Sequence, residues 1–190
     1  GRTCYKSEDK ITEDSYDKFI RGIIKRGHES VIEHSSITVR ITTDRGVTHE
    51  IVRHRIASYS QESTRYCNYG TDKFGGGIAV IRPSTIPSGT PAYDVWLDAM
   101  HSAEDKYMAL LANGCTPQQA RAVLPNSLKT EIVMTTNIRE WRHFFALRCA
   151  PAAHPDMREV ALLTLALFHE NIPLFFDDLY EQYKEDIEKL

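Results

Sequence analysis

The sequence predicts a single α+β domain. Segments with helical spacing of apolar residues occur in turn with segments in which apolar and polar residues alternate. No internal repeat, low-complexity stretch or linker divides the chain. At 190 residues the chain is long enough to bury a core of its own. Its 42% hydrophobic and 26% charged residues are ordinary for a globular protein.

The first part of the chain is expected to hold a helix, a strand and a loop. Apolar residues recur at helical spacing over 16–24, with Thr12 as the expected N-cap and Gly27 as the end of the helix. The segment 35–42 alternates apolar and polar residues, which is typical of a half-buried strand. Residues 67–77 are rich in glycine and are expected to form a loop.

Further elements follow from turn and capping residues in the rest of the chain. In order, they are a short strand at 77–81, a long helix from Thr90 and Pro91 to Gly114, a short helix at 116–125, a strand at 127–136, a helix capped by Asn137, and two final helices that separate near Pro173.

Charge is unevenly distributed along the chain. Residues 177–190 hold six acids and two lysines, a net charge of −4. Because the whole chain carries −3, residues 1–176 carry +1. A weakly positive body with local arginine clusters suits small phosphorylated ligands better than a nucleic acid, which normally requires a broad basic face.

Cysteine usage and hydropathy indicate a cytoplasmic protein without a metal or a membrane partner. The four cysteines, Cys4, Cys67, Cys115 and Cys149, form no C-x-x-C pair, so neither a zinc site nor a disulfide framework is expected. No apolar run approaches the ~20 residues that span a bilayer, and no signal peptide opens the chain. The opening GRTCY resembles the middle of an element, so we expect that an N-terminal strand is missing.

The stretch RHRIASYSQESTRY, residues 53–66, is the strongest chemical signal. Arg53, His54 and Arg55 are adjacent, so on a helix their side chains would point in three directions. Hydroxyl side chains follow, and Arg65 ends the hydroxyl-rich run. Arginines with hydroxyl and backbone donors hold phosphate through charge-assisted hydrogen bonds. The alternative is a solvated surface with unrelated ion pairs. The serines ahead of Arg65 argue against this alternative.

A second arginine-rich stretch, NIREWRHFFALR, occupies residues 137–148. Positions 137, 141, 144 and 148 share one helical face, so Asn137 and Arg148 are expected to touch a ligand along it. Arg142 is expected to face solvent. For Arg142 and Arg158 we favour surface salt bridges over a role in binding.

These motifs resemble those of the flavin-dependent thymidylate synthases. The pattern Arg-His-Arg, seven residues, then Ser matches Arg53, His54, Arg55 and Ser63. The segments GHESVIEH, ARAVLP and NIREWRHFFALR occur in the family's order and spacing. The resemblance covers about residues 2–165, nearly the whole chain, and several independent motifs make it specific.

The resemblance implies a fold, a reaction and an assembly. The expected fold is the thymidylate synthase-complementing protein fold, one domain over residues 1–190 with a central, mainly antiparallel sheet flanked by helices. The expected reaction is reductive methylation of dUMP to dTMP, with methylenetetrahydrofolate as the carbon donor and FAD, reduced by NADPH, as the hydride source. The expected assembly is a cytoplasmic homotetramer with active sites shared between subunits.

The resemblance also assigns site residues. The positions matched to the FAD site are Ser30, Glu33, Arg53, His54, Arg55, Ile56, Asn137, Arg139 and His143. The positions matched to the dUMP site are Glu50, Arg53, Gln61, Glu62, Ser63, Thr64, Arg65, Arg121 and Arg148. Arg148 matches the catalytic arginine that polarises the uracil ring. His143 stands where some members have Asn, and Glu50 where others have Gln, so these two contacts can differ in detail.

The chemistry of the residues agrees with a flavin enzyme. Carbon-5 of uracil becomes nucleophilic through attack of a thiolate, or delivery of a hydride, at carbon-6. Cys67 and Cys149 are the cysteines near the motifs, and neither lies in a Pro-Cys-His or Pro-Cys-Gln setting. The hydride route is therefore the better fit. Ser63 lacks an evident general base, so we expect it to bind the nucleotide and not to act as a nucleophile.

Two other classes of protein compete with this interpretation. A metal hydrolase would use His28, His34, His49 or His54 with nearby glutamates, but no H-x-x-x-H or H-D pair is present. An arginine-rich nucleotide or nucleic-acid binding module without catalysis would stack bases on Tyr59, Tyr66 and Tyr69. The net charge of −3 and the acidic C-terminal segment argue against a nucleic-acid partner.

Overall fold

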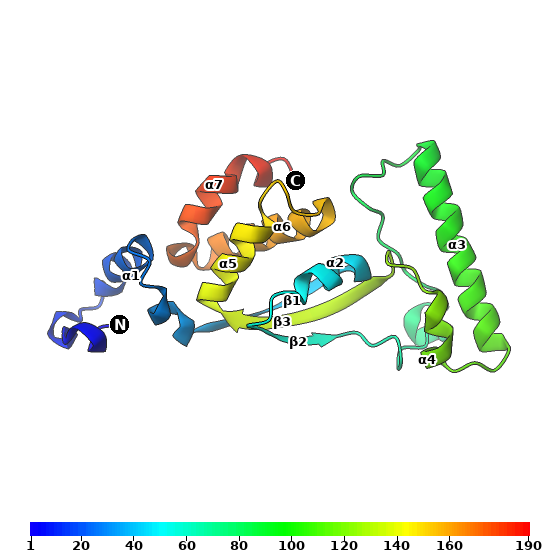
Figure 1. Cartoon of the computed structure of the whole chain (residues 1–190), viewed down its shortest axis with the longest axis horizontal. Coiled ribbons are helices and arrows are strands. Elements are labelled where there is room, and N and C mark those ends of the chain that lie inside the picture. Colours follow the sequence, from blue (N-terminus) through cyan, green and yellow to red (C-terminus); the bar gives the residue numbers. More distant parts are fainter. The chain divides into compact units, whose positions relative to one another are not determined.

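The chain forms two compact units. The computed structural model describes residues 1–190 (Figure 1). Unit 1 comprises residues 1–38 and 135–190, and unit 2 comprises residues 39–134. Strands β1 (Ser36–Asp44) and β3 (Lys129–Asn137) each run from one unit into the other. The expectation of one functional domain over residues 1–190 stays a prediction.

A three-stranded antiparallel sheet confirms the predicted α+β fold class. The strand order is β1-β3-β2, with β2 at Ser58–Gln61. Along β3, Thr130, Ile132, Met134 and Thr136 are buried while the residues between them are partly exposed. This period of two means that the sheet has one covered face and one more open face. The strands expected at 35–42 and 127–136 are confirmed.

Helices around an aromatic core make up most of unit 1. They are α1 (Ser15–Lys25), α5 (Ile138–Arg148), α6 (Pro155–Asn171) and α7 (Asp177–Ile187), with 3₁₀ turns at Thr3–Tyr5, Glu8–Lys10, Glu29–His34 and Pro173–Phe175. Helix α6 packs against both α5 and α7 (Figure 1). Trp141, Phe145 and Phe168 meet in the core, with ring centroids 4.9–5.8 Å apart. Such contacts add to the hydrophobic stabilisation of this unit.

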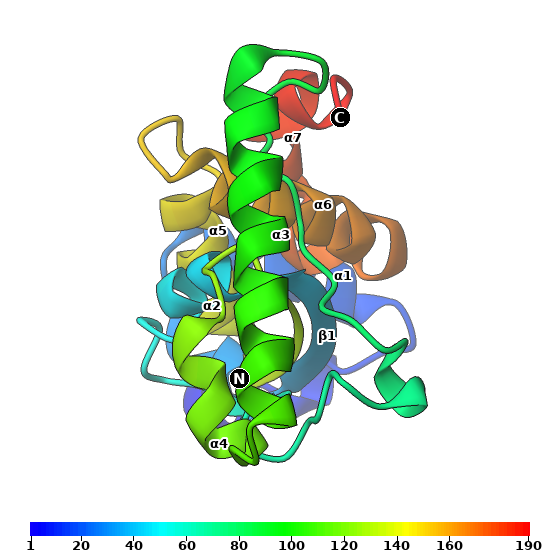
Figure 2. The ribbon, with the colours of Figure 1, turned by 90° about the vertical axis from the view of Figure 1, so that its right-hand side faces the viewer.

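Unit 2 has its own smaller core beside a long helix. Its helices are α2 (Arg45–Ile51), α3 (Pro91–Ala112) and α4 (Pro117–Ala120), with 3₁₀ turns at Asp72–Phe74 and Arg121–Val123. Helix α4 packs at the foot of α3 (Figure 2). Tyr69, Tyr107, Ala120 and Leu128 form the buried cluster.

Several predicted caps are confirmed. The Thr90 hydroxyl accepts a hydrogen bond from the Tyr93 amide at the start of α3, and Gly114, with φ of 84°, follows its end. Thr116 forms the capping box of α4 with Gln119. The Asn137 side chain accepts from the Glu140 amide, 2.9 Å away, at the start of α5. The two final helices separate at Pro173, as expected.

Other local predictions are wrong. Thr12 does not cap α1, because that helix begins at Ser15, whose hydroxyl donates to the Thr12 carbonyl at 3.0 Å. Residues 77–81 form only an isolated bridge between Val80 and Leu128. A glycine run precedes this bridge and Pro83 follows it, and both weaken strand pairing.

Helix α2 and strand β2 were not expected from the sequence. Asp44 accepts a hydrogen bond from the Val47 amide at 2.7 Å, which is the cap that starts α2. The four cysteines are free thiols. No helix in the structure combines the length and the apolar character needed to cross a membrane.

Candidate active site

The predicted site residues are divided between the two units. Unit 2 holds Glu50, Arg53, His54, Arg55, Ile56, Gln61, Glu62, Ser63, Thr64, Arg65 and Arg121. Unit 1 holds Ser30, Glu33, Asn137, Arg139, His143 and Arg148. The two groups differ in how their charged side chains are partnered.

Residues 53–65, here named the arginine segment, begin just after α2. The backbone amides of Arg53 and His54 donate to the carbonyls of Glu50 and Ile51, at 3.3 and 3.1 Å. These bonds to the third preceding residue tighten the last turn and end the helix at Ile51. The Arg-His-Arg triplet therefore lies beyond the end of the helix. Arg53 and Arg55 are exposed, whereas His54 is buried.

The arginines of this region have only neutral partners. Arg65 Nε donates to Gln118 Oε1 at 3.0 Å, and its guanidinium lies over the Tyr66 ring. Arg121 Nη1 donates to the Thr64 hydroxyl at 3.5 Å. None of Arg53, Arg55, Arg65 and Arg121 forms an ion pair. Their positive charges are therefore available to an anionic ligand.

Short hydroxyl side chains contact two of these arginines, Arg65 and Arg121. The Ser63 carbonyl accepts from the amides of Tyr66 and Cys67, at 3.0 and 2.9 Å, so a tight turn follows β2. Ser63 Oγ accepts from the Arg65 amide at 3.4 Å, and no carboxylate or imidazole contacts it. A serine hydroxyl without a base is a hydrogen-bonding group and a poor nucleophile.

Gln61, the last residue of β2, and Glu62, which follows it, have different hydrogen-bond partners. The Gln61 amide donates to the hydroxyls of Thr48 on α2 and Thr130 on β3, at 2.9 and 3.4 Å. Glu62 instead accepts from the Tyr69 hydroxyl at 2.7 Å. Burial and this bond to Glu62 raise the pKa of Tyr69. The two predicted dUMP contacts are therefore each held by different neighbours within unit 2.

A pocket of about 640 Å³ in unit 2 is lined in part by residues of all three strands. Its walls include Tyr69 and Phe74, and its charged residues include Arg40, Glu62 and Lys129. Lys129 lies 3.8 Å from Glu62 and so is already paired. Among the predicted site residues, only Gln61 and Glu62 line the pocket. The pocket is therefore separate from the group of unpaired arginines.

Arg139, a predicted FAD contact, is neutralised by carboxylates in unit 1. Its Nη1 bonds Glu33 Oε1 at 2.5 Å, and its Nε lies 3.3 Å from Glu29 Oε2. These carboxylates, Glu33 foremost, raise the pKa of Arg139 above its usual value. The structure thus brings the predicted contacts Arg139 and Glu33 together, and a flavin phosphate would compete with both glutamates for the guanidinium.

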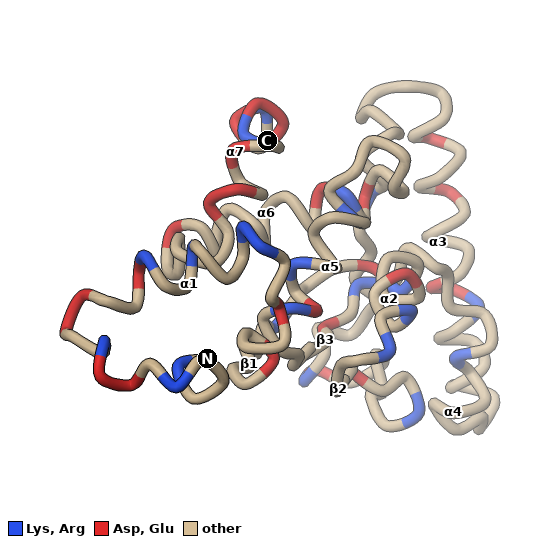
Figure 3. Tube along the Cα trace, turned by 60° about the vertical axis from the view of Figure 1, so that its left-hand side comes forward, with Lys and Arg blue, Asp and Glu red and all other residues tan.

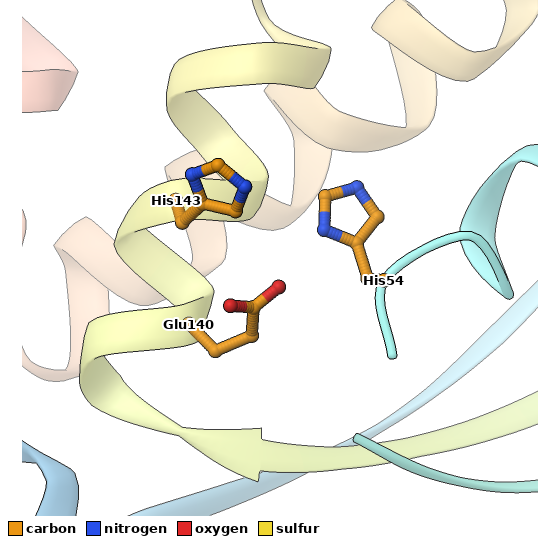
Figure 4. Close-up of side chains that lie close together, drawn as sticks. All are labelled: His54, Glu140 and His143. Carbon is orange, nitrogen blue, oxygen red and sulfur yellow. The ribbon is translucent and has the colours of Figure 1, made fainter. Parts of the chain in front are cut away.

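Part of the predicted ligand face of α5 lies in the hydrophobic core. Asn137 caps the helix, and Trp141 and Phe144 are fully buried in the core. The middle of the face shared by Asn137 and Arg148 thus supplies hydrophobic core, and ligand contact by these two residues themselves stays a prediction. Glu140 and His143 lie one turn apart on the same helix (Figure 4).

Arg142 and Arg158 form the expected salt bridges. Arg142 makes two bonds with Asp178, at 2.8 and 2.6 Å, and Arg158 lies 2.5 Å from Asp186. Both acids belong to α7, on which acidic positions gather (Figure 3). The Arg142 side chain is only 11% exposed, so the expectation that it faces solvent is wrong. Burial opposes ionisation of Asp178, but the bonds from Arg142 outweigh it and lower the pKa of this carboxyl.

Neither cysteine near the motifs is a ready thiolate. Burial raises the pKa of Cys149 to about 12. Burial, together with the charge of Glu62, also raises the pKa of Cys67. At neutral pH both groups are therefore protonated thiols, which are weak nucleophiles.

Residues that support the arginine segment escaped the sequence analysis. Thr48, Thr130 and Gln118 contact predicted site residues through neutral hydrogen bonds. Tyr59, which was considered only as a stacking surface, donates to the carbonyls of Ile51, just before the triplet, and of His54 within it. The alternation of Tyr59 and Gln61 along one strand was the available signal for a shared face.

Comparisons with known proteins cover most of the chain. The family model described as thymidylate synthase complementing protein matches residues 1–174. A flavin-dependent thymidylate synthase of Geobacter sulfurreducens is 37% identical over 185 residues, covering 94% of this chain and 78% of the relative. The Corynebacterium aurimucosum enzyme of the same name is 36% identical, covering 95% and 77%. That of Pyrococcus furiosus is 35% identical, covering 85% and 66%.

Proposed function

The chain belongs to the thymidylate synthase complementing protein family, and on this premise we propose that it is a flavin-dependent thymidylate synthase, which methylates dUMP to dTMP. The family match includes Arg53, Arg55, Arg65 and Arg121, none of which has an acidic partner. The hydroxyls of Ser63 and Thr64 contact Arg65 and Arg121. This absence of acidic partners is the structural observation that carries the proposal.

The proposal extends to the remaining reactants and to the assembly. Methylenetetrahydrofolate is the carbon donor and NADPH the reductant of the flavin. The protein is a cytoplasmic homotetramer in which several subunits contribute to each active site. These statements follow from the family resemblance alone.

The nucleotide is proposed to bind at the end of β2. Arg53, Arg65 and Arg121 are suited to a dianionic phosphate, since their charges are not matched by acids. Ser63 and Thr64 add hydroxyl donors, and Glu50, Gln61 and Glu62 complete the predicted set. Ser63 acts as a ligand because nothing in contact with it can remove its proton.

FAD fits the chemistry of the same segment. Its pyrophosphate requires cationic donors, which Arg53 and Arg55 offer, with His54 and Ile56 beside them. In unit 1, Ser30, Glu33, Asn137, Arg139 and His143 are the proposed flavin contacts, of which Arg139 must share its donors with two glutamates. When bound and reduced, FAD supplies the hydride for carbon-6 of the pyrimidine.

Arg148 is proposed to polarise the pyrimidine ring. It ends α5 and is half-buried. A guanidinium beside the ring favours negative charge as it builds during the reaction. The protonated thiols of Cys67 and Cys149 support this electrostatic role over attack by a thiolate.

The visible spectrum of the purified protein tests the proposal. We expect a yellow protein, or one that takes up FAD on titration, and whose reduced flavin is reoxidised in the presence of dUMP and methylenetetrahydrofolate. A protein that binds neither FAD nor dUMP would contradict the proposal.

A further inference from the structure

Tyr59 reaches back from β2 to the arginine segment. Its hydroxyl lies 2.6 Å from the His54 carbonyl and 3.0 Å from the Ile51 carbonyl. Ile51 is the last residue of α2, and His54 is the centre of the Arg-His-Arg triplet. The final carbonyls of a helix lack partners within the helix, so a side-chain donor at this point closes its end.

Two hydrogen bonds, one of them from Tyr59, fix the path of the triplet at its central residue. His54 is bonded to Ile51 through its amide and to Tyr59 through its carbonyl, so the peptide groups beside Arg53 and Arg55 have little freedom. Tyr59 itself belongs to a strand within the sheet, and the next residue on the same face, Gln61, is bonded to Thr48 and Thr130. The direction of the arginines is thus tied to the sheet.

We propose that Tyr59 is a positioning residue that orients Arg53 and Arg55 for their anionic ligands. An exposed arginine without a carboxylate partner has no side-chain contact to hold it, so its direction depends on its backbone. Holding the backbone lowers the conformational cost of binding. The identity of the ligand, dUMP, rests on the proposed function, whereas the restraint on the backbone does not.

The variant Tyr59→Phe removes only the hydroxyl. In the protein without ligand, limited trypsin digestion should cut after Arg53 or Arg55 about tenfold faster than in the unaltered protein, because the open state of the segment is more populated. Tyr107→Phe is the matched control: it removes another buried hydroxyl of unit 2, one that accepts from the Tyr69 amide at 3.3 Å. The control should leave cleavage after Arg53 and Arg55 unchanged.

Binding of dUMP provides the second readout. Tyr59→Phe should weaken dUMP binding about tenfold, the scale of one hydrogen bond lost from a site that depends on orientation. Arg53→Lys keeps the charge but lacks the planar fork of arginine. If Tyr59 acts by orienting the Arg53 guanidinium, its effect should shrink when that group is absent. In the Arg53→Lys background, Tyr59→Phe should therefore weaken dUMP binding by about threefold or less.

The proteolysis and binding results together decide whether Tyr59 orients the two arginines. Two results together support the inference. Tyr59→Phe speeds cleavage after Arg53 and Arg55, and it weakens dUMP binding more when Arg53 is present than in the Arg53→Lys background. Unchanged cleavage, or equal losses in both backgrounds, overturns it, and so does a Tyr59→Phe variant that is unfolded by circular dichroism. An unaltered protein that does not bind dUMP refutes the proposed nucleotide, while the proteolysis result still decides whether Tyr59 holds the segment.

Discussion

Two groups of arginines, one in each unit of this protein, differ in their partners. In unit 1, Arg139, Arg142 and Arg158 each bond carboxylates, and Arg21 bonds both Asp17 and Asp177. In unit 2, Arg53, Arg55, Arg65 and Arg121 bond none. The arginines of the first group link elements of unit 1 through ion pairs. The charges of the second group are not neutralised by acids and are available to an anionic ligand. An arginine cluster in a sequence can therefore be assigned to ligand binding only once the structure shows whether acidic side chains lie next to it.

Substitution of Arg148 is expected to have the largest effect on turnover. It tests whether arginines with a role in ligand binding are confined to unit 2. It lies on a helix of unit 1 but is proposed to act on the pyrimidine. Arg148→Ala should lower dUMP-dependent oxidation of reduced flavin about 30- to 1,000-fold, the cost of losing a charged donor of ~2–4 kcal/mol. Flavin retention, measured by absorbance, should change far less. Near-normal turnover would remove Arg148 from the chemistry.

Arg142 should affect folding and not binding. Arg142→Ala removes both bonds to Asp178 and the bond to the Phe175 carbonyl, so the link between α5 and α7 is lost. We expect a loss of about 1–3 kcal/mol in the free energy of unfolding, since the Arg142 side chain is largely buried, although Asp178 is 55% exposed. Urea denaturation measures this loss. A loss below about 0.5 kcal/mol would mean that the pair contributes no more than an exposed one.

Ser63 should show a smaller effect on the ligand side of the comparison. Ser63→Ala should raise the dissociation constant for dUMP about tenfold, consistent with one or two hydrogen bonds of ~1–1.5 kcal/mol. Turnover at saturating dUMP should remain measurable. A variant that binds dUMP normally but has no turnover would identify Ser63 as a nucleophile.

The pH dependence of the Arg142–Asp178 pair gives the smallest effect. The pKa of Asp178 is lowered in the folded protein from its ordinary value of 3.8, so its stabilising contribution is present above that value. The contribution is lost as pH falls below 3.8 through the folded-state pKa. Between pH 5 and pH 3, the unfolding free energy of the Arg142→Ala variant should therefore fall less than that of the unaltered protein. Parallel pH profiles would contradict the pairing.

The sequence predicted the regular elements where local signals are strong. Thr90 with Pro91 and Gly114 bound α3 because caps act through nearest neighbours. Helix α2 was missed because it is short and its signal, the Asp44 cap, is a single residue. The strand expected at 77–81 reduced to one bridge, since pairing depends on distant residues such as Leu128.

The candidate site was less accessible to sequence reasoning. Residue types identified the anion-binding chemistry of Arg53, Arg65 and Ser63, and the family resemblance supplied the remaining positions. Helical periodicity placed Asn137 and Arg148 on one face but did not reveal that Trp141 fills that face with core. The acidic partners of Arg142 and Arg139 lie far away in sequence or on another element, so their pairing could not be read locally.

The measurement that tests the central claim most directly is the dissociation constant for dUMP in two arginine variants. Arg65→Ala removes an arginine that has only neutral contacts, and Arg158→Ala removes one that is paired with Asp186. We expect titration calorimetry to show binding at least about tenfold weaker for Arg65→Ala, as for a lost charged hydrogen bond, and unchanged for Arg158→Ala. Equal affinity in Arg65→Ala and the unaltered protein would contradict the assignment of the unpaired arginines to the nucleotide.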